Sequence, residues 1–224
     1  QDNASATPPV AIAAACGATD LAGLLSEACM PSLSQAQITS AFTQEGQQWA
    51  GIGVESGLDD DTIYVTRRVD SSGTQKSYEA VIAKTPNGTL GGKSCSNNVD
   101  GFLAGVNVQN NTEADSICNA AVATATTFNT NGSGQALRCL ENHNRQARGS
   151  IGVLSTEFRQ SAAGLFRFVK ANGVAPTHAG VASGEYQYYT DAALNTRTGA
   201  TLPTASALGY TAFLALFRSS FASP

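Results

Sequence analysis

The sequence predicts an α/β fold with a mixed, mostly parallel sheet flanked by helices, and three observations support this prediction. Apolar runs rich in β-branched residues, such as 62–69 (TIYVTRRV) and 150–156 (SIGVLST), have the character of strands. Segments with apolar residues at helical spacing, 72–84 and 133–149, alternate with these strands. With 224 residues the chain is long enough to bury a sizeable core.

The first third of the chain contains one clear helix signal. Residues 1–9 end in two prolines and indicate an extended lead-in, and 10–17 (VAIAAACG) has the character of a short buried strand. Ser34 is followed three residues later by Gln37, and apolar positions come next. This spacing is a capping box and predicts a short amphipathic helix over 34–44.

The middle of the chain carries weaker signals. Residues 87–111 are rich in Gly and Asn and favour a loop, with 101–109 (GFLAGVNVQ) as its one strand-like run. Residues 114–128 are compatible with a helix, although the Thr-rich end lowers the helix propensity. The segment 133–149 is a better helix, because Gly149 follows the periodic residues as a stop signal.

The last part of the chain combines a strand with an apolar tail. We expect a strand within 165–176 (LFRFVKANGVAP) that ends in a turn. Residues 205–221 are apolar nearly all round, as in a helix that other protein covers.

Composition excludes several classes of protein. Hydrophobic residues make up 42% of the chain, charged residues 13%, and the net charge is -4, which argues against nucleic-acid binding and against disorder. No apolar run approaches the roughly 20 residues of a membrane helix. The polar residues are mainly Asn, Gln, Ser, Thr and Gly, and the chain starts at Gln1 without Met. Together with its cysteines, these features predict a secreted protein, periplasmic or extracellular.

The five cysteines favour disulfides over a metal site. Cys16, Cys29, Cys95, Cys118 and Cys139 show no CxxC or Cys/His spacing. Two bridges would leave one thiol over. The sequence does not choose the pairing, but Cys16 with Cys29 and Cys118 with Cys139 are the most local pairs.

No catalytic, metal or cofactor motif is present. His143 and His178 belong to no motif with a mechanism and are expected to be ordinary surface residues. There is no G-x-S-x-G elbow. The acidic run 57–62 (GLDDDT) lacks the ligand spacing of a calcium loop, so an exposed turn is favoured. We therefore expect a protein that is not an enzyme and needs no cofactor.

Four N-x-[ST] sequons, at Asn3, Asn87, Asn110 and Asn131, match by chance in a chain this rich in Asn, Ser and Thr. They matter only if the source organism glycosylates secreted proteins.

The junction between the predicted strand 62–69 and helix 72–84 has two interpretations. Ser or Thr before a helix serves as an ordinary N-cap. A small turn followed by a helix N-terminus also suits an anion, because the first N–H groups have no partner within the helix and the helix dipole is positive there.

Four segments in this order resemble the phosphate-binding proteins of bacterial phosphate importers, members of the type II periplasmic-binding-protein superfamily. They are 33–49 (LSQAQITSAFTQEGQQW), 67–79 (RRVDSSGTQKSYE), 149–155 (GSIGVLS) and 166–189 (FRFVKANGVAPTHAGVASGEYQYY). The resemblance covers roughly residues 30–190. It implies that the chain has the α/β fold of the second lobe of such a protein.

The resemblance also implies a site for phosphate or a similar oxyanion. Its residues are Arg68, Asp70, Ser72, Gly73 and Thr74. A guanidinium gives bidentate hydrogen bonds to oxyanions, and hydroxyl and backbone N–H groups bind the remaining oxygens. Asp70 is expected to hold Arg68 or to accept a proton from the ligand. Arg67 alternates to the other face of the strand.

Family members have most of a first lobe before the segments that match here, and we expect this protein to lack that part. We expect an N-terminal arm (1–12), one lobe (13–190) and a C-terminal return segment (191–224). The first function predicted is phosphate or oxyanion binding.

The alternative is a structural subunit of an extracellular assembly with a vestigial anion site. In that case another copy or a partner chain covers the apolar helix near 205–221.

Overall fold

The computed structural model describes residues 23, 26–81, 105–123, 125–158 and 166–189, with the side chains of 79–81 left out. The chain divides into two compact units, residues 1–190 and 191–224, and all described residues belong to the first. The expected lead-in, the strand over 10–17 and the apolar tail lie outside the described residues.

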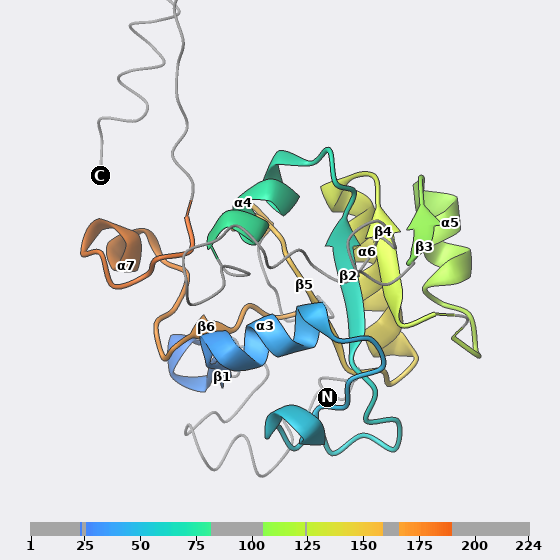
Figure 1. Ribbon diagram of the computed structural model, residues 1–224, viewed down its shortest axis with the longest axis horizontal. Helices are drawn as coiled ribbons and strands as arrows, with labels where there is room; N and C mark the ends of the chain where they lie inside the picture. Colours follow the sequence, from blue (N-terminus) through green and yellow to red (C-terminus); the bar gives the residue numbers. More distant parts are fainter. Residues whose placement is uncertain (1–22, 24–25, 82–104, 124, 159–165, 190–224) are drawn as a thin grey trace, which may run out of the picture. The chain divides into compact units, whose positions relative to one another are not determined.

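The helices and strands follow the alternating order that the sequence predicts. In chain order they are η1 (Glu27–Cys29), β1 (Ser32–Leu33), α3 (Gln35–Thr43), η2 (Ala50–Ile52), β2 (Tyr64–Arg68), α4 (Gly73–Val81), β3 (Val106–Val108), α5 (Asn111–Ile117), β4 (Thr127–Thr130), α6 (Ser133–Arg145), β5 (Ser150–Gly152), β6 (Lys170–Ala171) and α7 (His178–Ala182). Figure 1 shows these elements.

The strands form parallel sheets, so the α/β prediction is confirmed. The larger sheet has the order β3-β4-β2-β5, and β1 pairs with β6 in a second, two-stranded sheet. All ladders between these strands are parallel. Antiparallel pairing is limited, among the described residues, to isolated bridges such as Gln48 with Thr62.

Alternate residues of β2 belong to two different core clusters. Val65 packs with Phe42 of α3 and Tyr78 of α4, whereas Tyr64 packs with Phe128 of β4 and with residues of α5 and α6. Because successive side chains of a strand point to opposite faces, α3 and α4 cover one face of the sheet and α5 and α6 the other. Figure 1 shows α5 beside β3, far from α3.

Two local predictions about helix starts are confirmed. The Ser34 hydroxyl accepts a hydrogen bond from the N–H of Gln37, and the Gln37 side chain accepts one from the N–H of Ser34. This capping box starts α3. The junction after β2 is likewise a turn followed directly by α4.

The prediction of a helix over 114–128 is wrong in its second half. Helix α5 begins earlier, after the N-cap Asn110, and ends at Ile117. Residues 127–130 form β4, which pairs with both β2 and β3 and is buried at every position. Thr and Phe suit a strand, and pairing with β2 and β3 on both sides fixes the segment in that conformation.

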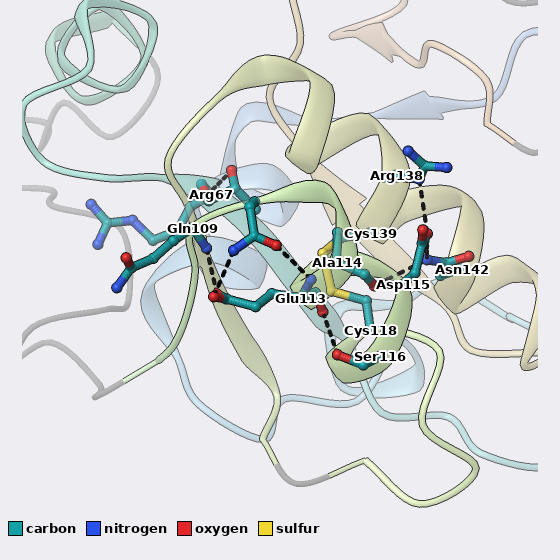
Figure 2. Close-up of a disulfide and its surroundings, with 12 residues drawn as sticks. Arg67, Gln109, Glu113, Ala114, Asp115, Ser116, Cys118, Arg138, Cys139 and Asn142 are labelled. Carbon is teal, nitrogen blue, oxygen red and sulfur yellow. Dashed lines mark hydrogen bonds and ion pairs between the residues drawn. A yellow bond between two sulfur atoms is a disulfide. The ribbon is translucent and has the colours of Figure 1, made fainter.

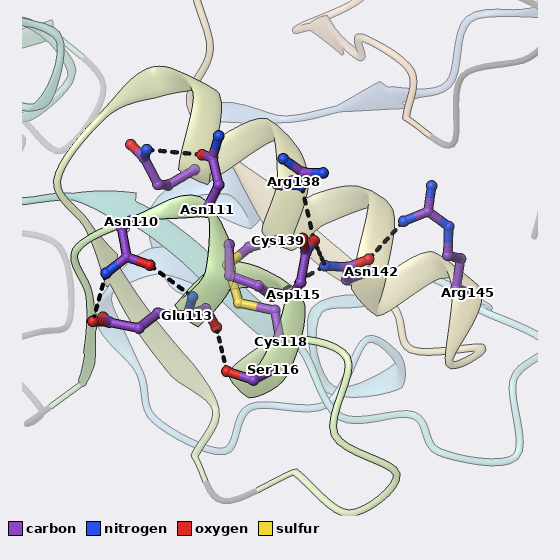
Figure 3. Close-up of polar contacts among 12 residues, drawn as sticks. Asn110, Asn111, Glu113, Asp115, Ser116, Cys118, Arg138, Cys139, Asn142 and Arg145 are labelled. Atoms are coloured by element: carbon purple, nitrogen blue, oxygen red, sulfur yellow. Dashed lines mark hydrogen bonds and ion pairs between the residues drawn. A yellow bond between two sulfur atoms is a disulfide. The ribbon is translucent and has the colours of Figure 1, made fainter.

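A disulfide and a set of polar contacts join α5 to α6. Cys118 is bonded to Cys139, which is one of the two most local pairs in the sequence (Figure 2). Cys29 is also disulfide-bonded, to a partner outside the described residues. Arg138 Nε of α6 lies 2.8 Å from Asp115 Oδ1 of α5 (Figure 3). The side-chain amide of Asn142 donates to the carbonyl of Ala114 at 3.0 Å.

The expectation for the two histidines is half right. His178 is exposed. His143 is wholly buried in the last turns of α6, where it contacts Tyr64 and Phe128. The expectation failed because His143 lies on the face of α6 that packs against the sheet.

Candidate functional site

The connections that leave β2 and β4, two neighbouring strands, run in opposite directions along the strand order of the sheet. From β2 the chain passes through α4 toward β3, on one side, and from β4 it passes through α6 to β5, on the other. The two helices therefore leave neighbouring strands toward opposite faces. In open parallel α/β sheets, ligands bind in the crevice outside the carboxyl ends of strands whose connections diverge in this way. The segments 68–74 and 131–133 follow these ends.

Arg68 is the last residue of β2, and its guanidinium reaches across to the segment after β4. The Nε–H donates to the carbonyl of Thr130 at 3.3 Å, and Nη2 donates to the carbonyl of Asn131 at 3.0 Å. Nη1 donates to the hydroxyl of Ser133, the first residue of α6. Partial burial lowers the pKa of Arg68 from its ordinary value.

These three bonds leave part of the guanidinium available. Arginine has five N–H donors, and three of those of Arg68 are used, so one N–H remains on each terminal nitrogen. No carboxylate pairs with Arg68 in the described part of the chain. The side chain therefore presents a positive charge whose partners there are all neutral.

Asp70 forms its ion pair with Arg67, where the sequence led us to expect Arg68. Arg67 and Arg68 point to opposite faces of the sheet, as predicted, and Arg67 is in register with Asn129 of β4. The Arg67 side chain is only 2% exposed. A buried cation needs a counter-charge, and Asp70, three residues on, supplies it.

Ser72, Gly73 and Thr74 lie where the sequence places them, at the start of α4. The first helical bond is from the N–H of Lys76 to the carbonyl of Ser72, at 3.0 Å. Within the described residues, nothing accepts a hydrogen bond from the backbone N–H groups of Gly73 and Thr74 or from the hydroxyls of Ser72 and Thr74. These groups are the donors that an oxyanion would use.

The space beside this turn is open. A Cβ built on Gly73 would meet no atom within 4 Å, and Gly73 does not have a positive φ. Glycine at this position therefore relieves no backbone strain or close packing within the described protein. Its lack of a side chain keeps the approach to the first N–H groups of α4 clear.

The start of α6 adds a second set of helix N–H groups at the same edge of the sheet. Its N-cap is Gly132, and no side chain caps its first turn. The Arg68 guanidinium bonds to Ser133 in this turn. No direct hydrogen bond joins the Arg68 side chain to Ser72 or Thr74. The structure thus places the predicted residues along one edge, with Arg68 toward α6 and the Ser-Gly-Thr turn at α4.

Two further residues of this edge were missed by the sequence reasoning. Gln75 is fully buried, and its side-chain oxygen accepts a hydrogen bond from the N–H of Arg68 at 3.1 Å. The spacing of Ser72 and Gln75 resembles a capping box, which would predict a bond to the N–H of Ser72, so no local signal predicts the contact with Arg68. Asn129 accepts a hydrogen bond from Arg67 at 3.3 Å, and no local pattern predicts this contact across 62 positions.

The other candidate sites have structural roles. In the acidic run, Asp60 accepts from the N–H of Thr62 and from the hydroxyl of Tyr64, and Asp61 accepts from the N–H of Ala50. Within the residues that the structure describes, no group of three or more His, Cys, Asp or Glu side chains could hold a metal ion.

Comparisons with known proteins identify no relative. No protein-family model, curated protein or solved structure matches the chain. Of the helices within the described residues, none is both long and apolar enough to cross a bilayer.

Proposed function

We propose that this chain binds phosphate or a similar oxyanion at the carboxyl ends of β2 and β4. The observation that carries the proposal is the concentration of unused donors at this edge. They are two N–H groups of Arg68, the backbone N–H groups of Gly73 and Thr74, and the hydroxyls of Ser72 and Thr74. All of them donate, as a fully ionised oxyanion requires.

Charge at the site also favours an anion. Arg68 has neutral partners within the described structure, and two helices, α4 and α6, begin at this edge of the sheet with their positive dipole ends. Asp70, the nearest carboxylate in sequence, is paired with Arg67. Its negative charge is therefore balanced, which lowers the repulsion that an incoming oxyanion would meet.

The proposal extends to the type of protein. The parallel α/β architecture and the order of the four sequence segments support a single lobe of the periplasmic-binding-protein fold. The disulfide between Cys118 and Cys139 supports a secreted protein, because disulfides persist in oxidising compartments. The alternative role in an extracellular assembly rests on the apolar segment 205–221, which lies outside the described residues, and stays a prediction.

Calorimetric titration of inorganic phosphate into the wild-type protein and an Arg68→Gln variant tests the site. Glutamine keeps an amide group that can donate to the carbonyls near Thr130 and removes the charge. We expect saturable binding by the wild type and at least a tenfold loss of affinity in Arg68→Gln. Losing a charge-assisted bond typically weakens binding by about 1.5 to 3 kcal/mol, which is more than tenfold.

The matched control is Arg138→Gln. Arg138 is on α6, and its side chain is 44% exposed and pairs with Asp115. The control removes the same charge from the protein but leaves the donors at residues 68–74 unchanged, so it should bind phosphate like the wild type. Absence of binding by the folded wild type, or equal weakening in both variants, would show that this edge of the sheet is not an oxyanion site.

A further inference from the structure

A second site lies away from the sheet edge, as a cavity on the side of the sheet that α3 and α4 cover. Its volume is about 210 Å³. It lies between α3, α4, β5 and the segment around β6, and Ile38, Tyr78, Ile151 and Ala171 are among its lining residues. None of the residues assigned to the oxyanion site contributes to its wall.

The wall of the cavity is aromatic and aliphatic. Among the described residues, seven aromatic side chains line it, including Phe42, Trp49, Phe168 and Tyr186. Three pairs of these rings contact one another: Phe42 with Tyr78, Phe166 with Phe168, and Tyr186 with Tyr188, with centroids 4.7, 5.7 and 5.5 Å apart. The cavity is thus lined by faces and edges of rings, which favour a flat aromatic guest in stacked or edge-to-face contact.

The polar groups at the wall argue against a positively charged ligand, because a cation would find no counter-charge among the described lining residues. No carboxylate lines the cavity within the described residues, and its only charged group there is Arg167, which donates to the carbonyl of Cys29 at 3.2 Å. A buried charge without a partner is strongly unfavourable. Burial also raises the pKa values of Tyr186 and Tyr188, so their phenols stay neutral at ordinary pH.

The volume of the cavity indicates the size of its ligand. An engineered apolar cavity of about 150 Å³ stays dry and holds benzene. A cavity of about 210 Å³ therefore has room for one aromatic ring with a small substituent. The geometry points to a binding site for a small aromatic molecule with one ring and no positive charge, distinct from the oxyanion site.

The fluorescence of Trp49 can report binding at this site. Trp49 is the only tryptophan of the sequence, it lines the cavity, and it is 8% exposed. Toluene does not absorb at the red edge of tryptophan excitation, so it can be titrated while Trp49 emission is followed. The same samples give the thermal midpoint, which a ligand of the native state raises.

We expect a saturable change in Trp49 emission with an apparent Kd of roughly 0.1 to 1 mM, as for a ligand of about seven heavy atoms. A Val153→Phe variant fills the cavity, because Val153 is a half-buried lining residue. It should weaken binding at least tenfold. The matched control is Val122→Phe, at a position that is 79% exposed and not part of the cavity wall, and it should bind like the wild type.

Val169→Phe serves as a second filling variant if Val153→Phe does not fold, because Val169 also lines the cavity. The proposal is overturned if the folded wild type shows neither a saturable emission change nor a higher thermal midpoint in toluene. It is also overturned if the folded filling variant binds toluene as tightly as Val122→Phe does.

Discussion

The imidazole of His143 stacks on the ring of Tyr64, with ring centroids 5.4 Å apart and an interplanar angle of 27°. Phe128 also contacts the imidazole, at a centroid distance of 4.6 Å. Neither ring nitrogen of His143 has a hydrogen-bond partner in the described structure, and the residue is 0% exposed. This burial, reinforced by the positive charge of Arg148, lowers the pKa of His143 to about 3.

We predict that His143 makes the protein less stable in acid. Its ordinary pKa is 6.5 and its pKa in the folded protein is about 3, so between these pH values the unfolded chain binds a proton that the folded chain does not. The free energy of unfolding therefore falls by about 1.4 kcal/mol per pH unit as the pH drops from 6.5 toward 3. Urea unfolding of the wild type and of His143→Phe at several pH values measures this contribution.

The control for this measurement is the exposed histidine. His178→Phe should keep the pH dependence of the wild type, because His178 is exposed and its replacement leaves the buried imidazole of His143 unchanged. His143→Phe should flatten the acid side of the curve. If both variants keep the wild-type slope between pH 6.5 and 4, His143 is not a buried neutral group.

The ion pair between Arg67 and Asp70 should contribute more to stability than the pair between Arg138 and Asp115. The carboxylates are equally exposed, at 47% and 48%, but Arg67 is 2% exposed and Arg138 is 44% exposed. Removing the partner of a buried charge is far more destabilising than breaking a surface pair. We expect Asp70→Asn to lower the free energy of unfolding by about 3 kcal/mol.

The matched variant Asp115→Asn should lower it by less than about 1 kcal/mol. Urea titrations of the two variants at neutral pH give the comparison. A similar loss in both would mean that Asp70 does not compensate the buried guanidinium of Arg67.

Ala147 ends α6 in a conformation that suits glycine. Its φ is 54°, in the left-handed region, and the N–H of Arg148 bonds to the carbonyl of His143 at 2.9 Å. A residue with a Cβ costs about 1 to 2 kcal/mol in this conformation. Glycine avoids this cost, but part of the gain in stability is offset because glycine has more conformational freedom in the unfolded chain. We expect Ala147→Gly to stabilise the protein by about 0.5 to 1 kcal/mol.

Ala182→Gly is the counterpart, because Ala182 is an exposed residue within α7 without a positive φ. Glycine in a helix is unfavourable by up to about 1 kcal/mol, so this variant should have a lower thermal midpoint than the wild type. If Ala147→Gly also has a lower thermal midpoint than the wild type, the backbone at Ala147 is not strained in the way that its φ indicates.

Local signals predicted the elements that depend on neighbours in the sequence. The Ser34 and Gln37 spacing predicted the start of α3, and the alternation along 62–69 placed Arg67 and Arg68 on opposite faces. The Ser-Gly-Thr turn predicted the start of α4. Each of these is decided within one helical turn or one strand, where backbone geometry and hydrogen bonding to near neighbours dominate.

The sequence by itself therefore determined the α/β class, the strand and helix around the Arg-Arg segment and the candidate donors at residues 68–74. Only the tertiary structure decided that Asp70 pairs with Arg67, that Thr127–Thr130 is a central strand, and that His143 is buried. The ion pair of Asp70 depends on which arginine is buried. The central strand and the burial of His143 depend on pairing and packing between elements distant in the chain. Periodicity gives the face on which a residue lies, but burial and charge compensation depend on what packs against that face.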